Sequence, residues 1–296
     1  MKFVVLRPFF NRPEMLYVSI ESEVRARKYY NLDYTTLFVA DHGVPPACLE
    51  IANMYPYEKS IVVRNQKMYG WGNILEGFKQ IFNDDEVTYG LNIEDDCLLH
   101  ETYFKYVHEA SQLFKDENMS VINASRRHVG DSSVNTVRKL RLFEAPGCII
   151  NANFFNKFVR PYATFDYYKN RAATINKINI RNNDDPRSKY RPSRNNALNH
   201  VGWDGMVNRL VDTAFMEEGY ESISPDSDRQ IHIGFYGQNR PGSFPSKETD
   251  FMTRVNLLRK ITASAESMQQ FDRNYKDYNH FSPDLNNWDG ALELAI

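Results

Sequence analysis

The segment Leu91-Asn92-Ile93-Glu94-Asp95-Asp96-Cys97-Leu98-Leu99 decides the fold, because it sets three consecutive acids directly between two apolar stretches. Residues 87–93 have the length and composition of a short buried strand, and residues 102–114 carry apolar side chains at helical spacing. The acids therefore follow the carboxyl end of a strand. In open α/β sheets, ligands bind at that edge, so we expect a binding site there.

Three adjacent carboxylates need a cation nearby. Clusters of oxygen ligands suit Mg²⁺ or Mn²⁺, with a phosphate of the ligand sharing the ion. The acids could instead form an acidic turn in solvent that binds nothing. The sequence alone leaves that alternative open.

Strand and helix patterns alternate on both sides of this segment. Short apolar runs predict strands, and apolar residues at helical spacing between them predict helices. Such alternation predicts an α/β fold with a mostly parallel central sheet flanked by helices and joined by right-handed crossovers. The other strands are expected at residues 2–6, 35–40, 60–63, 120–124, 147–150 and 230–233, and the other helices at residues 13–30, 45–54, 68–82, 204–220 and 251–261.

The composition is that of an ordinary globular protein, with 42% of the 296 residues hydrophobic and 25% charged. A chain of this length predicts one α/β core with an insertion. No run is apolar and long enough for a signal peptide or a membrane span, so we expect no membrane partner and a cytoplasmic location. Cys48, Cys97 and Cys148 lack metal-type spacing and are expected to be reduced and buried.

The net charge of −2 conceals an asymmetry along the chain. Residues 157–194 contain ten Lys and Arg against three Asp, a net charge of +7, which leaves −9 for the remainder. Aromatic residues lie among these bases, a composition suited to phosphate backbones and stacked nucleobases. A polar surface segment without a ligand is the alternative. Turn formers at residues 182–186 and 191–196 predict loops. The aromatic residues are Phe158, Tyr162, Phe165, Tyr167, Tyr168 and Tyr190.

Four motifs, in their order along the chain, resemble those of GT-A nucleotide-sugar glycosyltransferases, and most of all N-acetylglucosaminyltransferase I and its relatives. The first strand leads to an arginine in Val4-Val5-Leu6-Arg7, and the next ends on an aspartate in Phe38-Val39-Ala40-Asp41. Glu94-Asp95-Asp96 is similar to the family's Glu-Asp-Asp motif, and Gly202-Trp203-Asp204-Gly205 resembles its later Trp-Asp motif. The resemblance covers the first 125 residues and residues 201–237.

The resemblance implies a GT-A (Rossmann-like) fold, a nucleoside diphosphate sugar as donor, with a UDP-sugar expected, and Mn²⁺ or Mg²⁺ as cofactor. It implies that Arg7 and Asp41 bind the donor, with Asp41 at the nucleobase. It also implies that Asp96 binds the metal, while Glu94 and Asp95 approach the sugar and the ribose.

By the same resemblance, Asp204 is the catalytic base and His232, a late histidine, joins the metal or the diphosphate. Each residue also has a structural alternative. Asp204 could cap the helix that it begins, and His232, between two isoleucines, could be a core histidine. Arg7 could be a surface charge, and Asp41 a turn residue.

The expected chemistry is transfer with inversion at the anomeric carbon. A divalent ion neutralises the charge that develops on the departing nucleoside diphosphate, acting as Lewis acid and template. An acceptor hydroxyl attacks from the opposite face. A carboxylate within hydrogen-bond reach, expected to be Asp204, takes its proton.

The basic segment falls where the resemblance lapses, and it is the expected acceptor side. Its charge favours DNA, as for bacteriophage enzymes that add sugars to hydroxymethylated pyrimidines, and the location would then be the host cytoplasm. Three alternatives stay open: a glycan or protein acceptor, a nucleotidyltransferase or nuclease, and a DNA-binding module without enzymatic activity. The expected acceptor contacts are Arg187, Lys189, Arg191, Arg194 and Trp203.

We expect one GT-A catalytic domain over residues 1–296. Residues 1–125 would form its nucleotide-sugar-binding half, and residues 126–250 its acceptor half, with the basic insertion at residues 157–200. Residues 251–296 would form a C-terminal helical tail. The sequence predicts neither the sugar nor the oligomeric state.

Overall fold

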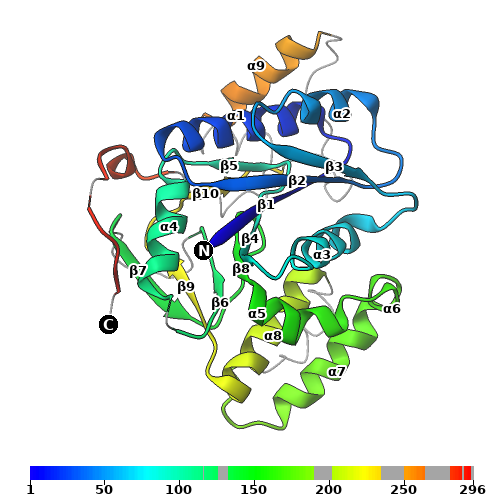
Figure 1. Ribbon diagram of the computed structural model, residues 1–296, viewed down its shortest axis with the longest axis vertical. Coiled ribbons are helices and arrows are strands. Elements are labelled where there is room, and N and C mark those ends of the chain that lie inside the picture. The colour runs from blue at the N-terminus through cyan, green and yellow to red at the C-terminus, as the bar shows by residue number, and fades with distance from the viewer. Residues whose placement is uncertain are drawn as a thin grey trace.

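The computed structural model describes residues 1–115, 117–125, 133–189, 202–234, 250–263, 281–288 and 290–294. Their centre is a nine-stranded sheet in the order β11-β7-β9-β6-β8-β4-β1-β2-β3, with helices on both faces (Figure 1). Five of the eight pairings in this described sheet are parallel, which confirms the α/β class with a mostly parallel sheet. The strands are β1 (Lys2–Phe9), β2 (Tyr34–Ala40), β3 (Lys59–Val63), β4 (Val87–Asn92), β6 (Met119–Ile122), β7 (Thr136–Leu140), β8 (Ile149–Asn151), β9 (Glu221–Pro225) and β11 (Glu293–Leu294).

The first four expected strands form an all-parallel half of the sheet, β4-β1-β2-β3. Its central strand β1 is buried on both faces, as parallel strands usually are. Because side chains alternate along a strand, Val4 and Leu6 pack in one cluster with α3, while Phe3 and Val5 pack in another with α4. The helices of this half are α1 (Pro13–Tyr29), α2 (Pro46–Asn53), α3 (Tyr69–Ile81) and α4 (Tyr103–Leu113).

The other half of the sheet is mixed. β8 is antiparallel to both β4 and β6, and β9 is parallel to β6 but antiparallel to β7. Helix α8 (Trp203–Glu218) precedes β9 and ends at Gly219, whose φ of 71° is left-handed, close to the predicted end. Helix α9 (Phe251–Ile261) packs with α1.

A second, two-stranded sheet holds the acidic segment. β5 (Cys97–Leu99) begins directly after the three acids and pairs antiparallel with β10 (Gln230–His232). In this register His232 lies opposite Cys97. A strand from late in the chain is thereby brought beside the acids.

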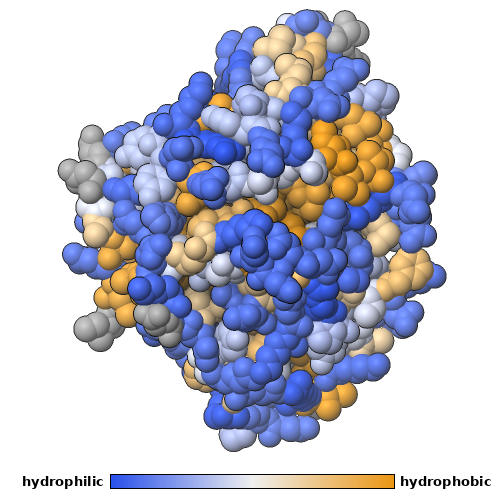
Figure 2. Space-filling model, in the orientation of Figure 1, coloured by the Kyte–Doolittle hydropathy of each residue, from blue (hydrophilic) through white to orange (hydrophobic). Residues whose placement is uncertain are grey.

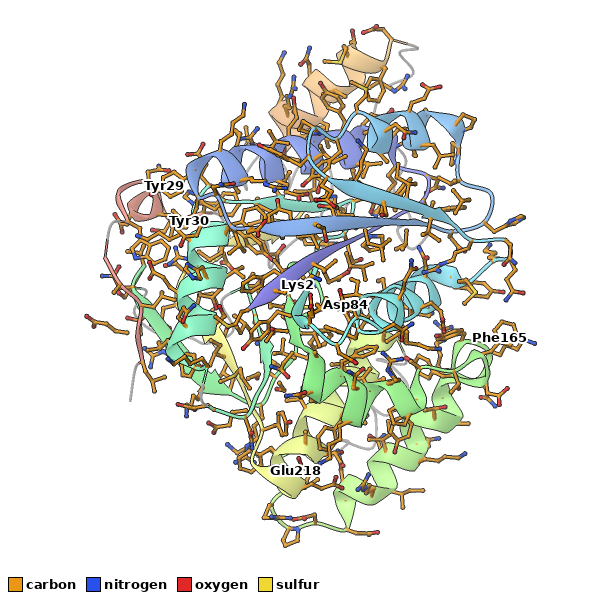
Figure 3. All side chains as sticks on the ribbon, viewed as in Figure 1. Lys2, Tyr29, Tyr30, Asp84, Phe165 and Glu218 are labelled. Atoms are coloured by element: carbon orange, nitrogen blue, oxygen red, sulfur yellow. The ribbon has the colours of Figure 1, made fainter. Side chains whose placement is uncertain are left out.

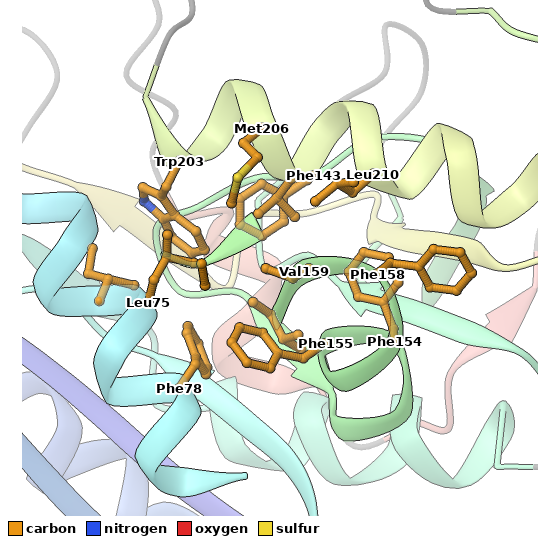
Figure 4. Packing of buried hydrophobic residues seen from close by; sticks show 14 of the residues in the cluster. Leu75, Phe78, Phe143, Phe154, Phe155, Phe158, Val159, Trp203, Met206 and Leu210 are labelled. Atoms are coloured by element: carbon orange, nitrogen blue, oxygen red, sulfur yellow. The ribbon is translucent and has the colours of Figure 1, made fainter. Parts of the chain in front are cut away.

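The described part of the basic segment is mainly helical and contributes rings to the core. Phe158, Tyr167 and Tyr168 are at most 5% exposed, and they belong to one cluster with residues of α3 and α8. Figure 4 shows Phe158 in this cluster. The interpretation of these three rings as stacking surfaces for nucleobases is therefore wrong. Phe165, by contrast, is 44% exposed (Figure 3). The helices are α5 (Ala152–Phe154), a π-helical turn (Phe155–Val159), a 3-10 turn (Arg160–Tyr162), α6 (Phe165–Lys169) and α7 (Arg171–Asn183), and the predicted loop at residues 191–196 lies outside the described residues.

The amino ends of β1 and β4 lie at the sheet edge opposite the acids. There Lys2 Nζ pairs with Asp84 Oδ2 at 2.7 Å and with Glu86 Oε2 at 3.2 Å (Figure 3). The surface in view is mainly hydrophilic, with an apolar patch over α2 and β3 (Figure 2). All three cysteines are buried and none forms a disulfide, as expected.

The described C-terminal residues are only partly helical. After α9, a 3-10 helix (Pro283–Asn287) is followed by β11, which pairs with β7. The division of the chain into two halves and a tail stays a prediction. None of the helices in the described ranges is long and apolar enough to span a bilayer.

Candidate functional site

The acidic segment borders a cavity at the carboxyl ends of the parallel strands. The cavity, about 290 Å³ in volume, has walls from the β1–α1 loop, the start of α3, the acidic segment and the turn after β10. Because parallel strands end at one edge of a sheet, residues far apart in the sequence meet here. Five predicted site residues line the cavity: Asp41, Glu94, Asp95, Asp96 and His232.

Arg12, which was not among the predicted site residues, lies against Asp95 and Asp96. Its Nη1 is 2.5 Å from Asp96 Oδ2, its Nη2 bonds Asp95 Oδ1, and its Nε is 3.4 Å from Asp95 Oδ2. The signal in the sequence was its position at the end of the first strand-to-helix loop, directly before Pro13. A guanidinium fork matches the geometry of carboxylates and phosphates alike, so Arg12 can serve either partner.

His232 contacts the same carboxylate. Its Nε2 is 3.0 Å from Asp96 Oδ2, because the pairing of β10 with β5 sets it beside the acidic segment. Burial alone would lower the pKa of His232, but the Asp96 carboxylate outweighs burial and raises it. The side chain is 28% exposed and lines the cavity, so His232 faces the site as well as the core.

The pKa values of the three acids are shifted in different directions. Burial, with Asp96 and Asp204, raises the pKa of Glu94 to about 8. Burial also raises the pKa of Asp95, although Arg12 opposes it. At Asp96 the effect of burial is outweighed by Arg12 and His232, which hold its pKa well below the usual range. Asp96 is therefore the acid of the three whose pKa is lowered, which favours the ionised form that a metal ligand needs.

Asp96 and His232 offer a metal ion a mixed oxygen and nitrogen donor set. Asp96 Oδ1 is buried, yet it has no hydrogen-bond partner among the described residues, which is unusual for a buried acceptor. Within the described ranges, no three His, Cys, Asp or Glu side chains are grouped so that they could hold an ion by themselves. The residues thus fit Mg²⁺ or Mn²⁺ bound through one or two protein ligands, with water and phosphate completing the coordination.

Asp41 both holds a turn and borders the cavity. Its Oδ1 accepts hydrogen bonds from the backbone N–H groups of His42 (2.9 Å) and Met68 (2.7 Å), and Met68 directly precedes α3. This contact fixes the start of α3, from which Asn73 also lines the cavity. The turn and ligand alternatives for Asp41 are therefore compatible.

Arg7 does not line the cavity. Its fully buried guanidinium pairs with Glu23 Oε2 at 2.5 Å and donates to Ser19 Oγ at 2.7 Å, so the surface-charge alternative is wrong. Ser19 Oγ in turn donates to the carbonyl of Cys97 at 2.6 Å and lies 3.2 Å from that of Glu94. The expected contact of Arg7 with a donor finds no support in this geometry. Arg7 instead supports the acidic segment from beneath.

Trp203 and Asp204 begin α8 and differ in exposure. Trp203 is 3% exposed and packs near Phe78, so its ring belongs to the core rather than to an acceptor surface (Figure 4). Asp204 is exposed, and its charge contributes to the raised pKa of Glu94, so the two carboxylates lie within electrostatic range. The N-cap of α8 is Gly202, so Asp204 lies in the first turn and favours the helix dipole without being the cap.

Two of the other predicted acceptor contacts, Arg187 and Lys189, are described, and neither lines the cavity. Arg187 and Lys189 are exposed, and Arg187 Nη2 pairs with Asp185 Oδ2 at 2.6 Å. Arg191 and Arg194 lie outside the described residues. The described part of the basic segment, residues 157–189, contributes no residue to the cavity lining, and the role of the segment stays a prediction.

No protein-family profile and no curated protein sequence matches this chain. Solved structures with a similar fold include S. aureus TarS 1-349 in complex with UDP-GlcNAc, at TM-score 0.45 and 14% identity over 92% of this chain and 68% of that one. A second structure, S. aureus TarS, matches at TM-score 0.41 and 14% identity over 56% of this chain and 32% of the TarS chain. Mannosyltransferase PcManGT from Pyrobaculum calidifontis, in complex with GDP-Man and Mn²⁺, matches at TM-score 0.40 and 11% identity over 53% and 46%.

The match to this chain thus covers about a third of the length of S. aureus TarS, and 56% of the length of TarS 1-349 in complex with UDP. At such identities and TM-scores the likeness assigns neither a substrate nor residue roles to this chain. The resemblance to N-acetylglucosaminyltransferase I stays a prediction.

Proposed function

We propose that this chain is a glycosyltransferase that moves a sugar from a nucleoside diphosphate sugar to an acceptor hydroxyl, with inversion. The observation that carries the proposal is the pair Asp95 and Asp96, held with Arg12 and His232 beside the cavity where the parallel strands end. A diphosphate is strongly anionic and needs cations to bind and to leave. This site combines a guanidinium, an ionised carboxylate and an imidazole.

The residues divide the work as follows. The Arg12 fork can donate two parallel hydrogen bonds to a phosphate. Asp41 and Asn73, which line the same cavity, supply polar groups for the nucleobase and the ribose. Mn²⁺ or Mg²⁺ held by Asp96 and His232 would supply a Lewis acid that neutralises the charge of the leaving diphosphate.

Asp204 takes the proton of the acceptor hydroxyl in this proposal. The base must act on the face of the sugar opposite the diphosphate. Asp204 is exposed and does not line the cavity, yet its charge acts on Glu94, which does. Attack from that side, with loss of the diphosphate from the other, inverts the anomeric carbon.

For the acceptor, two candidates follow from the basic segment. A hydroxymethylated pyrimidine in DNA, in a bacteriophage setting, is supported by its charge of +7. A glycan or protein hydroxyl is supported by ion pairs that neutralise part of this charge. Lys157 pairs with Glu218, and Arg181 pairs with Glu217. The two acceptor candidates are distinguished by a variant in which four bases are replaced together by Gln: Arg187, Lys189, Arg191 and Arg194. A DNA acceptor predicts weaker duplex binding and a slope of log K against log [salt] reduced by about 3.6, whereas unchanged DNA affinity selects the other candidate.

The donor site is tested by thermal unfolding with UDP- and GDP-sugars, with and without Mn²⁺. A ligand at 100 times its Kd stabilises the folded state by about 2.7 kcal/mol. We expect stabilisation that requires Mn²⁺ and is lost in Asp96→Asn. Asp84→Asn is the control, because Asp84 is an aspartate paired with Lys2 at the opposite edge of the sheet. Failure of every nucleotide sugar to stabilise the parent, or equal stabilisation of Asp96→Asn, overturns the proposal.

A further inference from the structure

We propose that Arg12 is a built-in counter-ion of Asp95 and Asp96, which makes metal binding at Asp96 depend on a bound nucleoside diphosphate. The inference rests on the proposed function and adds a rule for the order in which the site fills. Without nucleotide, the guanidinium holds the carboxylates. With nucleotide, it passes to the diphosphate and Asp96 becomes available to the ion.

The geometry around Arg12 is that of a charge clamp. All three guanidinium nitrogens face the two adjacent carboxylates, with Nη1 on Asp96, Nη2 on Asp95 and Nε 3.4 Å from Asp95 Oδ2. The side chains of the two acids are 4–6% exposed, and that of Arg12 is 18% exposed. Buried carboxylates this close together are costly without a cation, so the clamp stabilises the site while it is empty of ligand.

The same clamp opposes a divalent ion. Asp96 Oδ2 already receives both Arg12 and His232, and only Oδ1 of this carboxylate has no described partner. An ion arriving alone would meet the positive guanidinium at close range, in a partly buried site where like charges repel strongly. Metal binding is therefore unfavourable until the guanidinium has another anion to contact.

A diphosphate supplies that anion. Arg12 lines the cavity itself, so its side chain can exchange a carboxylate for a phosphate without leaving the site. Phosphate accepts the same two parallel hydrogen bonds as a carboxylate, which makes the exchange nearly even for Arg12. By linkage, if a bound nucleotide raises the affinity of the protein for the metal, a bound metal raises its affinity for the nucleotide by the same factor.

The test measures Mn²⁺ binding without nucleotide, from the electron paramagnetic resonance signal of the free ion. We expect weak binding to the parent and binding at least tenfold tighter to Arg12→Gln. Arg12→Lys keeps the charge, so its Mn²⁺ affinity stays close to that of the parent even if Arg12→Gln folds poorly. Arg138→Gln is the matched control, because Arg138 on β7 makes a two-pronged pair with Asp226, directly after β9, with distances of 2.9 and 3.0 Å.

A second arm measures UDP affinity by calorimetry, in EDTA and in Mn²⁺. The parent should bind UDP at least tenfold more tightly in Mn²⁺, and the ratio should shrink in Arg12→Gln. If Mn²⁺ binds the parent and Arg12→Gln equally well, or the ratio is the same in both, the counter-ion inference is overturned while UDP and metal binding still uphold the proposed function. If neither protein binds Mn²⁺ or UDP, both proposals fall.

Discussion

Gly234 lies where any side chain would enter the candidate metal site. A Cβ added at this position would lie 2.5 Å from Asp96 Oδ2, 2.6 Å from His232 Cε1 and 3.0 Å from His232 Nε2. These distances are well inside van der Waals contact, so Gly234→Ala must displace the carboxylate, the imidazole or the turn after β10. We predict that this one methyl group weakens metal and nucleotide binding while the sheet stays folded.

The expected magnitude follows from the contacts that the methyl group disturbs. The methyl group meets Asp96 and His232, the two side chains that would hold the ion, and an interaction of a charged group contributes about 1.5–3 kcal/mol. Loss of one such interaction in the bound state weakens binding by about 10- to 100-fold, because about 1.4 kcal/mol corresponds to a factor of ten. The displaced groups also strain the turn, and overpacking of this kind costs about 1–3 kcal/mol of folding stability.

The assay is calorimetric titration of UDP in the presence of Mn²⁺, with urea unfolding as the measure of stability. Gly70→Ala is the matched control, because Gly70 lines the same cavity but its added Cβ would have nothing within 4 Å. We expect Gly70→Ala to bind as the parent does. Binding by Gly234→Ala within twofold of the parent would refute the placement of Asp96 and His232 at the ligand.

Three further predictions concern other residues. Ser19→Ala removes the hydroxyl between Arg7 and the carbonyl of Cys97. We expect the free energy of unfolding, measured with urea, to fall by about 1–3 kcal/mol and Mn²⁺ binding to weaken. Unchanged metal affinity would show that Ser19 only supports the fold. Asp204→Asn should lower kcat by about 10²- to 10⁴-fold while UDP affinity stays unchanged, and a parallel loss of UDP affinity would contradict its role as base. Burial, aided by the charge of Arg229, lowers the pKa of His100 from 6.5 to about 4. As the pH falls, the unfolded chain therefore takes up a proton at this histidine before the folded chain does. The free energy of unfolding of the parent should fall by up to about 2 kcal/mol between pH 7 and pH 5, and that of His100→Gln should not show this decrease. Equal pH dependence of the two proteins would rule this out.

The regular half of the fold was predictable because its strands carry a strong local signal. β1, β2 and β4 are apolar runs buried on both faces, and each is followed by a helix pattern. β5, β7, β9 and β11 were not predicted. β5 and β11 have three and two residues, which are too few to show the alternation of apolar and polar residues along a strand. β7 and β9 carry polar residues, and the burial of these residues depends on the pairing of the two strands. Tertiary contacts, rather than local sequence, make these strands.

The carboxylates of the site were predictable and their counter-ions were not. Glu94 to Asp96 are conspicuous because acids seldom interrupt apolar runs, and topology alone directs them to the ligand edge. Arg12 has only a weak signal, its position at the end of the first strand-to-helix loop, because an arginine in a loop is ordinary. The family resemblance implied that Arg7 binds the donor. Alternate strand residues face opposite ways, however, and Arg7 lies on the same face of β1 as Phe3 and Val5 rather than on that of Val4 and Leu6.

The most direct measurement is anomalous diffraction at the manganese edge from crystals of the whole chain grown with UDP and Mn²⁺. The account predicts one strong peak in contact with Asp96 and His232, bridged to the diphosphate, with the Arg12 guanidinium on a phosphate rather than on Asp96. A nucleotide bound elsewhere, or a peak remote from Asp96, would contradict it.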